Sequence, residues 1–195
     1  TILKDFGTTT QLLNYTLVGF FIFFALGILF IGPLSDKYGR KPVLLSGLVL
    51  YLISSLLCAL SMNIELLITF RITQAIGAGA MVSVSTAIVK DSFNDTERPR
   101  IIALIQMLSV LAPTLAPVIG AMIIKYVNWQ MTFVVLGFIS IVSIVIALLF
   151  EETLKNEKRV QGNAFQTFKS LGGIVRNKPF MNFLVSTGAT SAIYM

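Results

Sequence analysis

The sequence predicts an all-α fold, namely a polytopic bundle of membrane-spanning helices. Of the 195 residues, 55% are hydrophobic and only 12% are charged, and the mean hydropathy is +0.85. A composition so poor in charge does not suit a surface that faces water. Several apolar runs also reach or approach the roughly 20 residues that a helix needs to cross about 30 Å of hydrocarbon. The chain is therefore expected to cross a lipid bilayer several times.

Five complete spans and the start of a sixth are expected. The five are placed at residues 12–34, 43–60, 64–89, 101–124 and 129–150. The linkers between them are short, whereas residues 151–179 form a long, polar and basic stretch with a weakly amphipathic segment. We therefore expect an amino-terminal transmembrane bundle at 1–150, a cytoplasmic interdomain loop at 151–179 and the start of a carboxy-terminal transmembrane bundle at 180–195.

Lys and Arg residues gather on one side of the predicted bundle. Loops 35–42 and 90–100 and the stretch 151–179 hold almost all of them outside the spans, whereas the other side holds only Lys4 and Lys125. Because cytoplasmic loops carry the excess of positive charge, we expect these three segments in the cytoplasm and the first residues outside. A protein that starts inside would then need one more helix before Thr1. The net charge of +6 follows from this topology, and no nucleic-acid partner is expected.

The side chains that most enzymes and metal sites require are scarce in this sequence. It contains no His, and its one cysteine, Cys58, lies inside an apolar run. The predicted spans contain no carboxylate pair, and no nucleotide-binding loop occurs. We therefore expect no enzymatic activity, no metal site and no bound cofactor.

The stretch GPLSDKYGRKP, residues 32–42, follows the first predicted span. Gly39 supplies a tight turn, Pro42 suits the first turn of the next helix, and Arg40 and Lys41 meet the anionic inner leaflet. A positively charged cytoplasmic loop, which topology alone produces, would explain these features.

The order of these residues, however, closely resembles the G-x-L-a-D-r-x-G-r-k signature that joins the second and third helices of the major facilitator superfamily. The matching residues are Gly32, Asp36, Gly39, Arg40 and Lys41. The resemblance implies the amino-terminal half of such a transporter, lacking its first helix and ending at the start of helix seven. It also implies that Asp36, Arg40 and Asp91 form a conformational switch, whose ion pairs form in one arrangement of the two halves and break in the other.

Arg71 is the only basic residue within a predicted span. An arginine at a helix centre costs about 2.5–3.5 kcal/mol on insertion, so Arg71 needs water, a partner or a function, unless it reaches back to the outer interface. The pattern R-x-x-Q, formed with Gln74, resembles the helix-four motif of the same superfamily, which implies a role in proton coupling or in the cavity. The same helix carries small residues at a spacing that favours close packing, namely Ala75, Gly79, Ser83 and Ala87.

The segment VLAPTLAPVIGAM in the fourth predicted span carries two prolines among small residues. Proline bends a helix by removing a backbone donor, so this segment is expected to act as a gate or rocking surface. It resembles the helix-five motif of drug/proton antiporters, and its doubled A-P form resembles the Bcr/CflA multidrug exporters. The motif positions are Ala112, Pro113, Ala116, Pro117 and Gly120.

Two shorter matches, YVNWQMTF and FEETL, extend the resemblance over almost the whole chain. It implies proton-coupled efflux of drugs or other amphiphilic small molecules by alternating access, in a bacterial inner membrane. The implied partners are the lipid bilayer, an amphiphilic substrate and protons, the proton gradient is the energy source, and the full-length protein is a monomer. A sugar or metabolite symporter of the same superfamily is the alternative, and a membrane receptor or scaffold without transport agrees less well with the sequence.

Overall fold

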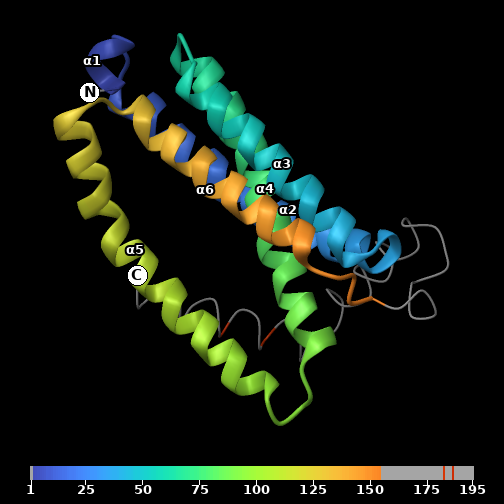
Figure 1. The fold of residues 1–195 in the computed structure, drawn as a ribbon. Helices are drawn as coiled ribbons and strands as arrows, with labels where there is room; N and C mark the ends of the chain where they lie inside the picture. The colour runs from blue at the N-terminus through green and yellow to red at the C-terminus, as the bar shows by residue number, and fades with distance from the viewer. Residues whose placement is uncertain (1, 155–181, 183–185, 187–195) are drawn as a thin grey trace. The chain divides into compact units, whose positions relative to one another are not determined.

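The computed structural model of the chain describes residues 2–154, 182 and 186, and all six of the elements that lie in them are helices. They are α1 (Ile2–Asp5), α2 (Thr10–Tyr38), α3 (Arg40–Ala59), α4 (Ile64–Ser92), α5 (Arg98–Tyr126) and α6 (Gln130–Leu149) (Figure 1). The five helices α2 to α6 are long and apolar enough to span a membrane, which confirms the predicted fold class. Most of the predicted interdomain loop and of the last span lies outside the described residues.

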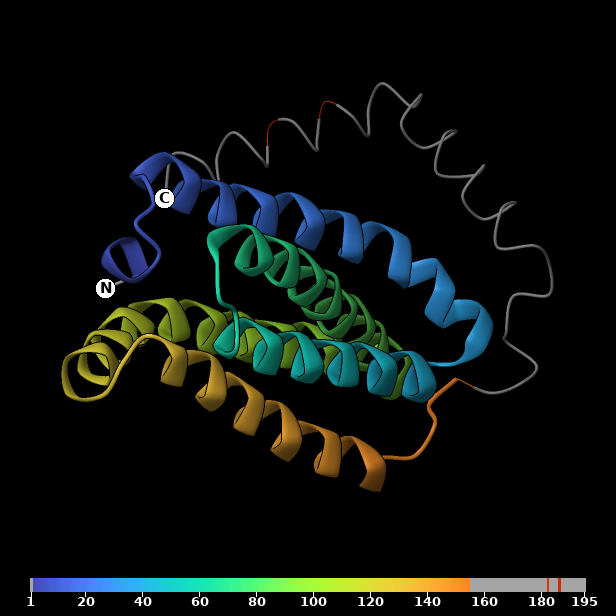
Figure 2. The same ribbon diagram turned by 90° about the horizontal axis from the view of Figure 1, so that it is seen from above.

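Helix α4 lies between α2 and α3, and the side of α3 that faces away from α4 packs against α6 (Figures 1 and 2). Small residues on α4 allow these contacts. A Cβ atom added to Gly79 would lie 2.6 Å from the carbonyl oxygen of Phe24 on α2, and one added to Gly77 would lie 2.8 Å from that of Gly47 on α3. The prediction that the small residues of this helix serve close packing is confirmed for Ala75 and Gly79, which are both buried.

Helices α2, α4 and α5 extend further than the apolar runs indicated and α3 starts earlier, whereas α6 stays within its predicted span. The prediction that residues 35–42 form a loop is wrong, because α2 continues to Tyr38 and α3 starts at Arg40. Helices α4 and α5 likewise run two or more residues beyond the predicted span ends at 89, 101 and 124. An apolar run marks only the part of a helix that faces hydrocarbon, whereas its backbone hydrogen bonds continue into the polar interface. At the end of α2 they stop only at Gly39, where φ is 103°.

At the end of the bundle where α2 begins, aromatic side chains pack around α1, a short helix that the sequence did not predict. The indole Nε1 of Trp129 donates a hydrogen bond to Asp5 Oδ2 at 2.7 Å, and the Phe6 ring packs edge-on against the indole. Trp129 belongs to a buried cluster with Cys58, Leu67 and Phe133. This cluster fixes α6 against α3 and α4 at that end of the bundle.

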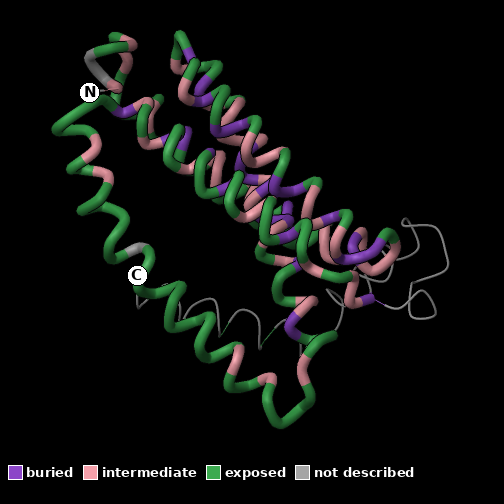
Figure 3. Tube along the Cα trace, in the orientation of Figure 1, coloured by how far each residue is buried: buried purple, intermediate pink, exposed green. Residues whose placement is uncertain are grey.

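Helix α5 has few contacts with the other helices, and most of its residues are exposed (Figure 3). The helix runs unbroken from Arg98 to Tyr126, and neither Pro113 nor Pro117 interrupts it. Elsewhere, apolar side chains such as Phe21 on α2 and Ile146 on α6 face outward. Exposed apolar side chains of this kind suit a lipid environment, where hydrocarbon and not water covers them.

Candidate functional site

The best-formed polar site lies where α2 ends and α3 begins. Gly39 is the only residue between the two helices, with φ 103° and ψ 155°. This region of backbone space is accessible almost only to glycine, because any Cβ atom would clash with the neighbouring peptide. The glycine lets the chain reverse direction within one residue. Arg40 therefore starts α3 next to the last turn of α2 and the end of α4.

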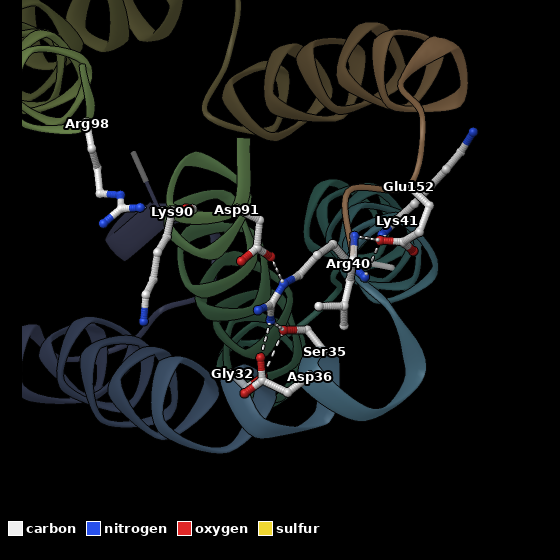
Figure 4. Close-up of polar contacts among 10 residues, drawn as sticks. Gly32, Ser35, Asp36, Arg40, Lys41, Lys90, Asp91, Arg98 and Glu152 are labelled. Carbon is white, nitrogen blue, oxygen red and sulfur yellow. Dashed lines mark hydrogen bonds and ion pairs between the residues drawn. The ribbon is translucent and has the colours of Figure 1, made fainter. Parts of the chain in front are cut away.

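The guanidinium of Arg40 joins three helices (Figure 4). Its Nη1 lies 2.6 Å from Asp36 Oδ1 on α2, and its Nε donates to Asp91 Oδ2 on α4 at 2.8 Å. Nη1 also donates to Ser35 Oγ at 2.6 Å, and that hydroxyl in turn donates to the carbonyl oxygen of Gly32. The Arg40 side chain is only 7% exposed, so its charge is both paired and removed from water.

Gly32, in the last-but-one turn of α2, lets this helix lie close to α4. A Cβ atom added to it would lie 3.0 Å from Ser83 Oγ. The structure thus brings Gly32, Asp36, Gly39, Arg40 and Asp91 to one place, where the motif resemblance grouped them. Their role in a conformational switch stays a prediction.

Two contacts connect the start of α3 to the end of α6. Both carboxylate oxygens of Glu152 accept hydrogen bonds from the backbone of Arg40 and Lys41, and Lys41 Nζ donates to the carbonyl oxygen of Leu148. Sequence reasoning did not assign a role to Glu152. A signal was present, because glycine precedes α3 and offers no side chain to cap it.

A groove of about 430 Å³ runs along the same end of the bundle and is lined by Asp36, Arg40, Lys90 and Arg98 among others. Arg98 closes the turn between α4 and α5, since it donates to the carbonyl oxygens of Lys90 and Phe93 and pairs with Asp95 at 2.7 Å. The groove therefore carries cationic side chains next to the half-exposed Asp36.

A second polar cluster surrounds Arg71, two turns from the start of α4. Its Nη1 donates to Gln74 Oε1 at 2.9 Å, and Gln74 Nε2 donates to Ser55 Oγ on α3 at 2.7 Å. The guanidinium carbon lies 4.4 Å from the ring centre of Phe20 on α2 and 5.7 Å from that of Phe133 on α6. These partners come from α2, α3, α4 and α6, so they hold the Arg71 side chain within the bundle. The contacts do not favour the alternative that this side chain extends back to the outer interface.

The Arg71 cluster differs from the Arg40 cluster in its charge. Among residues 2–154, no carboxylate forms a salt bridge with Arg71. An amide oxygen and two aromatic faces stabilise the cation instead, through a hydrogen bond and cation–π interactions. The sequence pattern indicated the pair Arg71 and Gln74, but it did not indicate Ser55 or the two rings, because these depend on how the helices are rotated.

The structure does not bring the α5 motif into either cluster. Ala112, Ala116 and Pro117 are exposed, and a Cβ atom added to Gly120 would meet nothing within 4 Å.

Within the described part of the chain, no group of three or more His, Cys, Asp or Glu residues is arranged to hold a metal ion. Both clusters connect different helices, the Arg40 cluster through ion pairs and the Arg71 cluster through hydrogen bonds and cation–π contacts.

Comparison with known proteins identifies the family. The sequence profile of the Major Facilitator Superfamily matches residues 1–195. An uncharacterized MFS-type transporter, YdgK of Bacillus subtilis, is 33% identical over 192 residues, which are 96% of this chain and 47% of that protein. A bicyclomycin resistance protein homolog of Haemophilus influenzae is 29% identical over 82% of this chain and 40% of its own length.

The fold is shared with a solved structure. The crystal structure of the human organic anion transporter MFSD10 (TETRAN) superposes with a TM-score of 0.64 at 28% identity, over 83% of this chain and 38% of that one. The chain spans about half the length of the curated relatives it matches. The expectation that it is not an enzyme is confirmed by this family of transporters. With five helices among its described residues that are long and apolar enough to span a membrane, and a profile match over its whole length, this multi-pass integral membrane chain belongs to the Major Facilitator Superfamily.

Proposed function

We propose that this chain is part of a secondary transporter that exports drugs or other amphiphilic small molecules in exchange for protons. The observation that carries this proposal is the Arg40 guanidinium, which pairs with Asp36 and Asp91 at the junction of α2, α3 and α4. Membership of the superfamily supports transport. The similarity to a protein named for bicyclomycin resistance and the antiporter-like prolines at 113 and 117 support drug export.

Transport would proceed by alternating access, in which two halves rock around a shared cavity. Asp36 is the mobile partner in this mechanism, because its side chain is 41% exposed whereas that of Asp91 is 22% exposed. In one arrangement Asp36 contacts the positive end of a helix in the second half while Arg40 holds it in place. In the other arrangement the halves separate at this end and water solvates the carboxylate. The ion-pair cluster thereby favours one of two states.

Arg71 and Gln74 are the candidates for proton coupling or for the wall of the cavity. The Arg71 cation has aromatic and amide partners in the described residues. A titratable acid near it, supplied by another part of the full-length protein, would gain or lose a charge partner as it releases or binds its proton. Proton movement and the position of Arg71 would then be linked.

The proposed setting is the cytoplasmic membrane of a bacterium, as suits the relatives in Bacillus and Haemophilus. Segments 35–42, 90–100 and 151–179 face the cytoplasm, the first residues face outward, and the bundle at 1–150 forms one half of the transporter. The Arg40 cluster is then at the cytoplasmic end and the Arg71 cluster nearer the outer end.

Inverted membrane vesicles that contain the full-length protein test this function. With an established pH gradient, adding a lipophilic cationic drug is expected to dissipate the gradient, because each drug molecule moves against protons. Vesicles without the protein are the control. No change with any drug but a change on adding a sugar would favour a sugar symporter of the same superfamily, and no change with either would reject proton-coupled transport.

A further inference from the structure

Glu152 binds the first turn of α3 although 112 residues separate it from Arg40. Its Oε1 accepts a hydrogen bond from the Arg40 backbone nitrogen at 3.0 Å, and its Oε2 accepts one from the Lys41 backbone nitrogen at 3.2 Å. Oε1 also accepts from the backbone nitrogen of Leu154. The carboxylate therefore joins the start of α3 to the chain that leaves α6.

These contacts complete the hydrogen bonding of the α3 terminus. The first N–H groups of any helix lack partners within the helix. Here the Gly39 nitrogen donates to the carbonyl oxygen of Ser35, the Arg40 and Lys41 nitrogens donate to Glu152, and Pro42 has no N–H group. Every backbone N–H group of this first turn thus has an acceptor, and two of these acceptors are the carboxylate oxygens of Glu152.

The backbone at Gly39 explains why the cap comes from a distant residue. Helices usually begin with Ser, Thr, Asp or Asn, whose side chain accepts from the first N–H groups. At position 39 these residues are excluded, because φ 103° and ψ 155° are accessible almost only to glycine. The turn that brings Arg40 next to Asp36 therefore leaves α3 without a local cap.

A reciprocal contact strengthens the connection. The Lys41 ammonium donates to the carbonyl oxygen of Leu148 at 2.8 Å, at the last turn of α6. A carboxylate thus lies at the positive end of α3 and an ammonium at the negative end of α6, and each charge has the sign that the helix dipole favours. The start of α3 and the end of α6 are held together at two points.

We propose that Glu152 is a positioning residue for the Arg40 cluster. It holds the Arg40 backbone so that the guanidinium reaches both Asp36 and Asp91. The effect on transport rests on the proposed function, whereas the effect on the α3 terminus does not.

Hydrogen exchange of the full-length protein in lipid nanodiscs tests the positioning directly. In Glu152→Ala, the Arg40 and Lys41 amides are expected to exchange about fivefold faster than in the wild type, because their acceptor is removed. Glu152→Gln is expected to give an intermediate rate, because one side-chain oxygen remains. Glu151→Ala is the matched control, since among the described residues the side chain of that exposed neighbour makes no hydrogen bond or salt bridge to α3, and its rates should equal the wild type.

Drug-efflux kinetics provide the second measurement. We expect Glu152→Ala to lower kcat severalfold with KM unchanged, Glu152→Gln to recover part of the loss, and Glu151→Ala to behave as the wild type. Unchanged amide exchange in Glu152→Ala would overturn the positioning role, and so would a raised KM with unchanged kcat. If the Ala variant fails to reach the membrane, the Gln variant gives the same test. Faster exchange combined with a wild type that moves no drug would reject the proposed function and keep the positioning role.

Discussion

Arg40 and Arg71 are two arginines of one bundle that are stabilised in different ways. Arg40 lies where α3 begins, next to the ends of α2 and α4, and is paired with two carboxylates. Arg71 lies within the bundle, where an amide oxygen and two aromatic rings hold it and, among residues 2–154, no carboxylate forms a salt bridge with it. Arg40, whose charge is neutralised by two carboxylates, is suited to joining helices. Arg71, which lacks a counter-charge among the described residues, is suited to the proposed response to an acid that binds and releases a proton.

Replacing Arg40 is expected to cause the largest loss of stability. Arg40→Met leaves Asp91 without its partner in a partly buried position, and breaking such a pair costs about 3 kcal/mol. Thermal unfolding in detergent measures the loss. Arg71→Met is the matched variant. It should lower the stability less, because it leaves no carboxylate without its partner. Equal losses in the two variants would remove the distinction between the two arginines.

Gly39→Ala is expected to cost about 2 kcal/mol, because alanine is strained at φ 103° and ψ 155°. Gly120→Ala is its control, since a Cβ atom there meets nothing within 4 Å and alanine favours a helix. The same unfolding measurement applies to both. A Gly39→Ala protein as stable as the wild type would show that the turn between α2 and α3 tolerates another backbone geometry.

A double-mutant cycle separates the two carboxylates of Arg40. The coupling of Arg40 with Asp91 is expected at about 1.5 kcal/mol, and that with Asp36 below about 1 kcal/mol, because the more exposed pair is weakened by water and salt. Cycles with Arg40→Met, Asp91→Asn and Asp36→Asn measure both values. A stronger coupling to Asp36 than to Asp91 would contradict its role as the mobile partner.

The smallest change in stability is expected for Arg71→Lys, within about 1 kcal/mol, because the charge is kept while the hydrogen bond to Gln74 and the stacking on Phe20 are altered. Transport is nevertheless expected to fall at least tenfold. Efflux rates at matched expression, compared with unfolding midpoints, give the test. A lysine variant that transports at the wild-type rate would show that a positive charge alone is sufficient at this position.

Hydropathy is a local property, so local sequence patterns predicted the spans, whereas the grouping of Asp36, Arg40 and Asp91 was expected only from the resemblance to a family motif. The ends of α2, α4 and α5 were placed too early, since apolar content stops at the interface but the hydrogen bonds of α2 continue to Tyr38. Glu152 was not predicted, because a cap that is 112 residues away depends on how α6 meets α3. The rings around Arg71 were missed for the same reason, since helix rotation decides which side chains face one another.

Transport by Asp36→Asn at wild-type expression tests the central claim most directly. The amide removes the charge but keeps the size of the side chain, and the Arg40–Asp91 pair remains to hold the helices together. We expect the protein to reach the membrane with near-normal stability and to lose drug-driven dissipation of the pH gradient. Unaltered transport by this variant would contradict the role of the Arg40 cluster as a conformational switch.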